Sequence, residues 1–143
     1  MSDDTEIRKV IEDRATAIRN RDADAAVRYY SEDAVNFDLA APLAYRGREA
    51  TDPAELRGWF ESWSGPIGLT FDRLEIHHAD EIAFVHGLMR MTGPRVDGAQ
   101  TDVWVRITLG LEKQDGTWRI VHEHQSFPTK MDGSGLSASD LKP

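Results

Sequence analysis

The chain has 143 residues, the length of one domain, and 40% hydrophobic with 29% charged residues is ordinary for a globular protein. It has no cysteine, which excludes disulfides, thiolate metal sites and cysteine nucleophiles. A net charge of -8 argues against nucleic acid or an anionic membrane as a partner. Because the polar start lacks the pattern of a secretory signal and no apolar run approaches ~20 residues, we expect a cytoplasmic protein.

Residues 5–20 form the first predicted helix. Apolar side chains recur there at helical spacing and define one buried stripe, along which Arg14 also lies. The apolar members of the stripe are Ile7, Val10, Ile11 and Ile18. Asp22 or Asp24 can cap a short second helix that runs through Tyr30, since a carboxylate accepts the free N–H groups of a first turn.

A short strand is expected over residues 34–39, followed by a loop. Asp52-Pro53 then opens a third helix, because aspartate caps a helix and proline suits its first position. This helix presents aromatic side chains, among them Trp59, which we expect to form part of the core and of a pocket wall.

Strand-like alternation replaces the helical period after Gly65-Pro66. The expected strands cover residues 69–77, 82–92, 101–113 and 117–127, and Asp115-Gly116 closes the last hairpin. Helices followed by antiparallel hairpins predict an α+β domain over residues 1–129, with about three helices covering an apolar pocket in a curved sheet. Residues 130–143 are expected to be a tail with little to bury.

The order of elements and the segment from Asp115 to Ser126 resemble the nuclear transport factor 2-like superfamily, and most of all its SnoaL-like and ketosteroid-isomerase-like members. The last strand also resembles the association domain of calcium/calmodulin-dependent kinase. The resemblance covers nearly the whole domain. It implies a cone-shaped half barrel, often dimeric, whose interior holds a ligand or a catalytic site, and it leaves the chemistry open.

The segment from Asp22 to Asp38 is similar to the ketosteroid isomerases, and the resemblance places Asp38 where those enzymes carry their general base. Their oxyanion-donating tyrosine would fall near Arg14, and their second donor, an aspartic acid, near Ile107 or Thr108. Both donors are therefore missing. A base without these donors loses most of the stabilisation of the dienolate, so steroid isomerisation by that mechanism is not expected.

Alternation along the last strand decides which polar groups can line the pocket. With a three-residue turn at residues 114–116, Glu123 and Gln125 share one face and His122 and His124 the other. We favour the Glu123 face as the pocket wall, because the pocket arginine of the kinase association domain matches Gln125.

The resemblance also points His86 and Arg90, on the strand over residues 82–92, inward. Together with Asp38 and Glu123 they would form a water-poor site in which a carboxylate takes a proton and an imidazole donates one. The alternative is that Asp38 is solvated, His86 is a satisfied core histidine and Glu123 is an ion-pair partner of Arg90. We thus predict Asp38 and His86 as catalytic, and as ligand-binding residues Arg14, Tyr30, Trp59, Arg90, Glu123 and Gln125.

A metal ion is the third possibility. His122 and His124 can present two imidazoles to one ion, with Asp102 or His86 as a third ligand. The pattern is common in half-exposed strands and shows no telling spacing to a third ligand, so we expect no metal and no cofactor.

Two main functions remain after these steps. The first is a cofactor-independent isomerase, dehydratase or cyclase that acts by proton transfer on a small apolar carbonyl or polyketide-like molecule. The second is a non-catalytic ligand-binding or dimerisation module. We also expect a homodimer through the outer face of the last two strands, where Trp104 and Ile120 would otherwise be exposed.

Overall fold

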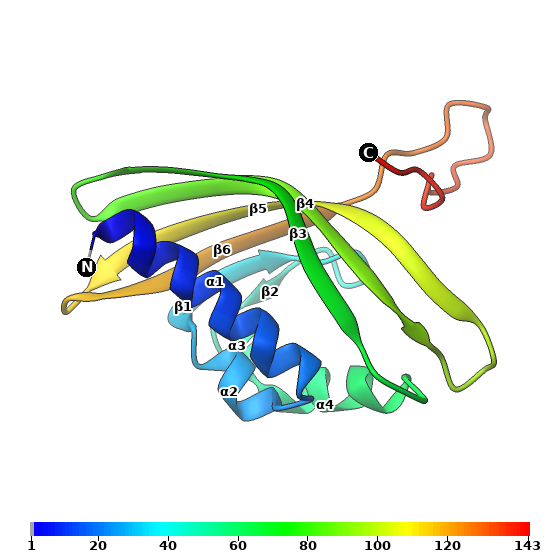
Figure 1. Cartoon of the computed structure of the whole chain (residues 1–143), viewed down its shortest axis with the longest axis horizontal. Coiled ribbons are helices and arrows are strands. Elements are labelled where there is room, and N and C mark those ends of the chain that lie inside the picture. Colours follow the sequence, from blue (N-terminus) through cyan, green and yellow to red (C-terminus); the bar gives the residue numbers. More distant parts are fainter. Residues whose placement is uncertain (1) are drawn as a thin grey trace.

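The computed structural model describes residues 2–143 and shows helices packed against one face of a curved, open sheet (Figure 1). The first half holds α1 (Asp3–Arg19), α2 (Ala23–Val27), β1 (Tyr30–Phe37), β2 (Tyr45–Arg46), α3 (Arg48–Thr51) and α4 (Pro53–Glu61). The second half holds β3 (Gly68–Ala79), β4 (Ile82–Pro94), β5 (Gln100–Gln114) and β6 (Thr117–Ser126). The predicted α+β class and half barrel are confirmed. Met1, the first residue of the expected domain, lies outside the described residues.

Aspartate side chains fix where two of the helices begin. Asp22 accepts a hydrogen bond from the backbone N–H of Ala25 at 3.0 Å, and Asp52 accepts one from that of Ala54 at 2.9 Å. Both bonds satisfy first-turn donors that have no partner inside a helix. α2 begins as predicted but ends earlier, because Tyr30 already belongs to β1.

The six strands lie in the order β2-β1-β6-β5-β4-β3. β1 runs parallel to β6, whereas the other neighbouring pairs are antiparallel. Long hairpins join β3 to β4, β4 to β5 and β5 to β6, and β6 then pairs with β1 near the middle of the sheet (Figure 1). The central position of β6 makes its inner face a natural floor for a site.

The β5–β6 hairpin differs from the prediction in two ways. Its turn has two residues, because Gln114 pairs with Thr117, and Asp115 and Gly116 both have a positive φ. A β-bulge at Val121 then shifts the register. The three-residue turn was therefore wrong.

The core lies between α1 and the concave face of the sheet. It buries Ile7, Ile11 and Ile18 of α1 together with Val85, Leu109, Leu111 and Ile120 of the strands. A fully buried side chain of this size contributes about 1.5–3 kcal/mol. Ile120, predicted on the outer face, is 0% exposed inside the core, because the two-residue turn sets it opposite Leu111.

Residues 130–143 leave the end of β6 and extend beyond the sheet (Figure 1). The backbone N–H of Lys130 donates to the carbonyl of Leu136 at 2.7 Å, and a bridge joins Thr129 to Ser137. Met131 is 96% exposed. Across residues 2–143, the helices are too short or too polar to cross a membrane.

Candidate functional site

A buried polar cluster lies where α1 crosses β1 and β6. Nη1 of Arg14 donates to Oε1 of Glu123 at 2.9 Å, and the hydroxyl of Tyr30 donates to Oε2 of the same carboxylate at 2.9 Å. Nη2 of Arg14 also donates to the Tyr30 oxygen. The side chains of Arg14 and Glu123 are only 13% and 8% exposed. Cation, carboxylate and phenol thus form one closed unit inside an apolar shell.

The local sequence explains why these groups meet. Arg14 falls on the apolar stripe of α1, three residues after Ile11 and four before Ile18, so the helical period aims it at the sheet. On β6, the bulge at Val121 turns Glu123 toward the same interior. A buried charge requires a partner, and each of these two supplies the other's.

Burial and charge act on the pKa values of the cluster in opposite directions. Burial disfavours the charge of Arg14, but the Glu123 carboxylate, with smaller help from Tyr30 and Asp38, outweighs it, so the pKa of Arg14 is raised. Burial raises the pKa of the Tyr30 hydroxyl well above its ordinary value. Arg14 therefore stays cationic and Tyr30 stays a neutral donor.

Asp38 follows β1 directly, on the same side of the strand as Asn36. Its Oδ1 accepts a hydrogen bond from the backbone N–H of Leu39 at 2.7 Å, and the residue is exposed, as the alternative of a solvated Asp38 states. Partial desolvation raises the pKa of Asp38; the Leu39 hydrogen bond lowers it, Glu123 raises it and Arg14 lowers it, and the net change is upward. The charges of Glu123 and Arg14 therefore act on the pKa of Asp38, but less strongly than its desolvation does.

Two buried polar atoms beside the cluster are unsatisfied. Nε of Arg14 and Oδ1 of Asn36 have no hydrogen-bond partner among residues 2–143. An unmade hydrogen bond of a buried group costs about 1–3 kcal/mol. One donor and one acceptor are thus available to a ligand or a water. Sequence reasoning missed Asn36, although the alternation of Ala34 and Asn36 along β1 would have placed it inside.

The enclosed space under α1 is small. A cavity of about 10 Å³, room for about one water molecule, is lined by apolar side chains of α1 and the sheet, and Arg14 is the one charged residue among the described residues that line it. A ligand larger than a water molecule therefore requires the side chains around this cavity, or α1, to move.

Gln125 and Trp59, two of the predicted ligand-binding residues, are both partly buried. Gln125 is opposite Ile107, on the face of Glu123, and is partly buried. Trp59 of α4 is partly buried, with its ring 5.4 Å from that of Trp63. Their contact with a ligand stays a prediction.

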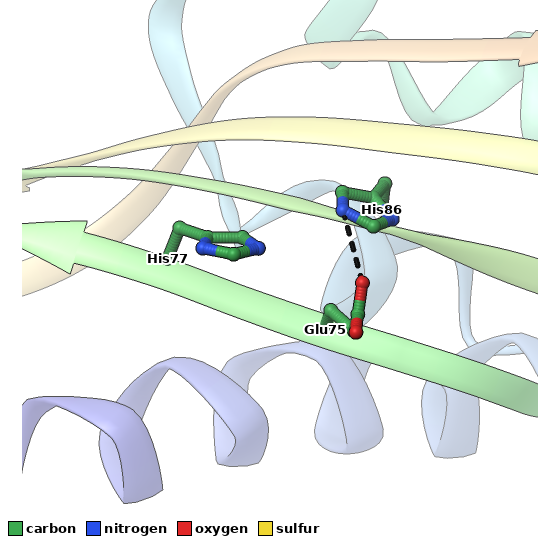
Figure 2. Close-up of side chains that lie close together, drawn as sticks. All are labelled: Glu75, His77 and His86. Carbon is green, nitrogen blue, oxygen red and sulfur yellow. Dashed lines mark ion pairs between the residues drawn. The ribbon is translucent and has the colours of Figure 1, made fainter.

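His86 and Arg90 lie on the outer face of the sheet, away from the cluster. Arg90 binds both oxygens of Asp102 at 2.9 Å, and the His86 side chain is 46% exposed beside Glu75 (Figure 2). The prediction that both face inward was wrong, because β4 turns Ala83, Val85 and Met89 to the core and its even-numbered residues outward. Arg14, not Arg90, pairs with Glu123.

The histidine pair of β6 also differs from a metal site. Nδ1 of His122 forms a hydrogen bond with the carbonyl of Val35. The ring of Phe37 lies edge-on to both imidazoles, at 4.9 Å from His122 and 5.3 Å from His124. Asp102, one expected third ligand, is engaged by Arg90, and His86, the other, lies beside Glu75.

Comparison with known families identifies the chain. Residues 7–130 match the model of the SnoaL-like domain, and the chain therefore belongs to the SnoaL-like domain family. A solved NTF2-like protein of unknown function from Pseudomonas putida KT2440 is 32% identical, with a TM-score of 0.85 over 100% of this chain and 99% of that one. No curated protein matches.

More distant structures share the fold. A ketosteroid isomerase-like protein from Erwinia carotovora atroseptica is 19% identical, with a TM-score of 0.71 over 85% of this chain and 93% of that one. A candidate scytalone dehydratase from Novosphingobium aromaticivorans is 14% identical, with a TM-score of 0.77 over 94% and 90%. At these identities the likeness concerns the fold.

Proposed function

We propose that the chain binds a small apolar molecule with a carbonyl oxygen and moves a proton on it without a cofactor. The observation that supports this proposal is Arg14, a buried cation held by Glu123 and Tyr30 with an unsatisfied Nε. Asp38, whose pKa is raised, follows the strand that pairs with Glu123. A base of raised pKa and a fixed cation are the two parts that an enolate-forming reaction needs. The names of two distant structural neighbours, isomerase-like and dehydratase, agree with this class.

The chemistry follows from these two groups. The Asp38 carboxylate takes a proton from the carbon beside the carbonyl, and the electrons of the broken C–H bond form an enolate. Arg14 stabilises the negative oxygen in place of the tyrosine and aspartic acid of the ketosteroid isomerases. Protonated Asp38 then returns the proton to another carbon, which isomerises the substrate, or to a departing hydroxide, which dehydrates it.

Glu123 and Tyr30 act through Arg14 in this scheme. Their hydrogen bonds hold the guanidinium in one orientation, with Nη1 and Nη2 engaged and Nε unpaired. A donor that is already oriented costs no reorganisation when charge develops. Both are therefore positioning residues, and Asp38 and Arg14 are the catalytic ones.

The second candidate is a non-catalytic binding or dimerisation module. One observation favours it: the oxygens of Glu123 and Tyr30 are bonded within the cluster, and the cavity beside them holds only about 10 Å³. In that case the cluster is a structural ion pair inside a filled half barrel.

Exchange of hydrogen for deuterium in small ketones distinguishes a proton-transfer enzyme from a non-catalytic module, and it requires no knowledge of the natural substrate. Small cyclic and aryl ketones in D₂O, followed by proton NMR, report removal of the proton beside the carbonyl. We expect the chain to accelerate this exchange for at least one ketone, and serum albumin at equal concentration serves as a control for non-specific catalysis. Binding of a ketone, seen as shifts of its resonances, without accelerated exchange would favour the non-catalytic module.

The oligomeric state is a separate prediction. Ile120 no longer supports an apolar outer face of the last two strands, but Trp104 remains partly exposed there. We expect a homodimer through the outer face of these two strands, which would cover Trp104 and would leave β3 and β4 accessible. Sedimentation of the protein at tens of micromolar checks this prediction, because a dimer with a dissociation constant of about 1 μM is mostly associated at that concentration. A monomer under these conditions would contradict the prediction.

A further inference from the structure

Three metal-ligating side chains meet on the outer face of the sheet. Glu75 and His77 come from β3 and His86 from β4 (Figure 2). One ligand atom of each lies within 4.8 Å of the others, and within residues 2–143 this is the one group of that kind. We propose that it binds a divalent transition-metal ion of the zinc type.

The backbone places the three side chains together. Glu75 and His77 are two residues apart on one strand and therefore share a face. Glu75 pairs directly with His86 in the register, and His77 pairs with Phe84, one step along the same face. The register shift between Asp72 and Glu75 sets this parity, because the extra residue turns Glu75 outward. The cluster thus follows from strand geometry.

Contacts among the side chains partly order them. The ring of His77 stacks on that of Phe84 at 4.7 Å, and lies 5.6 Å from the ring of His86. Oε2 of Glu75 lies 3.3 Å from Nε2 of His86. The two imidazole planes differ by only 23°, so one ring must rotate to point its nitrogen at a shared ion. An exposed side chain makes such a rotation within nanoseconds.

The donor set selects the class of ion. Two imidazoles and one carboxylate suit zinc, copper, nickel or ferrous iron, whereas calcium and magnesium take oxygen ligands. Three protein ligands leave a coordination position open to water or to a small anion. This site is not the one for which we expected no metal, because that one was built on His122 and His124 of β6. The site also lies on the opposite face of the sheet from the buried cluster, so a test of metal binding is independent of the proposed reaction.

Zinc titrated into the metal-stripped full chain, followed by calorimetry, tests the site. We expect one ion per chain. His77→Ala and His86→Ala should each weaken the affinity at least about tenfold, a loss of about 1.4 kcal/mol. His78→Ala is the matched control, because His78 follows His77 on β3 and points to the other face. Its affinity should equal that of the wild type.

A second measurement identifies the ligands. Cobalt(II) bound by imidazole nitrogens absorbs visible light, and we expect this absorption in the wild type and its loss in His86→Ala. Circular dichroism serves as the folding control for each variant. We expect all of them to fold, because the substituted side chains are exposed. Absence of zinc binding by the wild type overturns the proposal. So does an affinity that depends on His122 and His124 but not on His77 and His86.

Discussion

Replacement of Glu123 by alanine is expected to lower the free energy of unfolding by about 3–5 kcal/mol, because it leaves the charge of Arg14 buried without a partner. Arg14→Ala should cost a similar amount for the reciprocal reason. The measurement is urea unfolding followed by tryptophan fluorescence at neutral pH. Both side chains are nearly enclosed, so little solvent screening reduces the effect.

An exposed ion pair in the same chain is the control. Arg57 and Asp24 approach to 2.8 Å, but their side chains are 53% and 63% exposed. Arg57→Ala should therefore change the stability by less than about 1 kcal/mol. A similarly small loss for Glu123→Ala would contradict the prediction and would mean that water reaches the cluster.

Removal of the whole cluster separates stability from function. Arg14→Met, Tyr30→Phe and Glu123→Leu together leave no unpaired polar group of the three, and such a replacement often restores or increases stability. If the variant folds and no longer accelerates ketone exchange, the cluster serves the reaction. If it folds and exchange is unchanged, Arg14 is not the electrophile.

The sequence predicted the inward face of β6 correctly through two errors that cancel. The turn was taken as one residue too long, which by itself would have placed Glu123 on the wrong face. The bulge at Val121 adds one residue, so that Glu123 pairs with Leu109 and lies on the expected face, although not opposite the expected partner, Ile107. Bulges leave no reliable trace in hydrophobic alternation, so this register could not be derived from the sequence.

β4 shows a different limit. Both of its faces carry apolar residues, Phe84 on one and Val85 on the other, and the family resemblance decided between them wrongly. The polar side chains predicted the outer face more reliably. His86 and Arg90 share one face of β4, and both would need buried partners if that face pointed inward. The helix starts at Asp22 and Asp52 were predictable because capping depends on neighbours in the sequence.

Replacement of Asp38 by asparagine is expected to slow ketone exchange at least about 100-fold, the lower end of what a positioned base contributes. Asparagine keeps the acceptor for the Leu39 N–H but has no basic oxygen. Asp33→Asn is the matched control, because Asp33 is an exposed aspartate on β1, the strand that Asp38 follows, and the exchange rate of this variant should equal that of the wild type.

The pH dependence gives an independent reading of the same residue. The exchange rate of the wild type should rise with pH through a midpoint above about 3.9, the ordinary aspartate pKa, because the pKa of Asp38 is raised and only the carboxylate is a base. A raised folded-state pKa also means that the folded state binds more protons than the unfolded state in this range, so this group lowers stability as pH rises. Asp38→Asn should therefore be equal to the wild type in stability or slightly above it at neutral pH, with the difference vanishing below about pH 3.9. A large loss of stability with exchange retained would assign Asp38 a structural role and would favour the non-catalytic module.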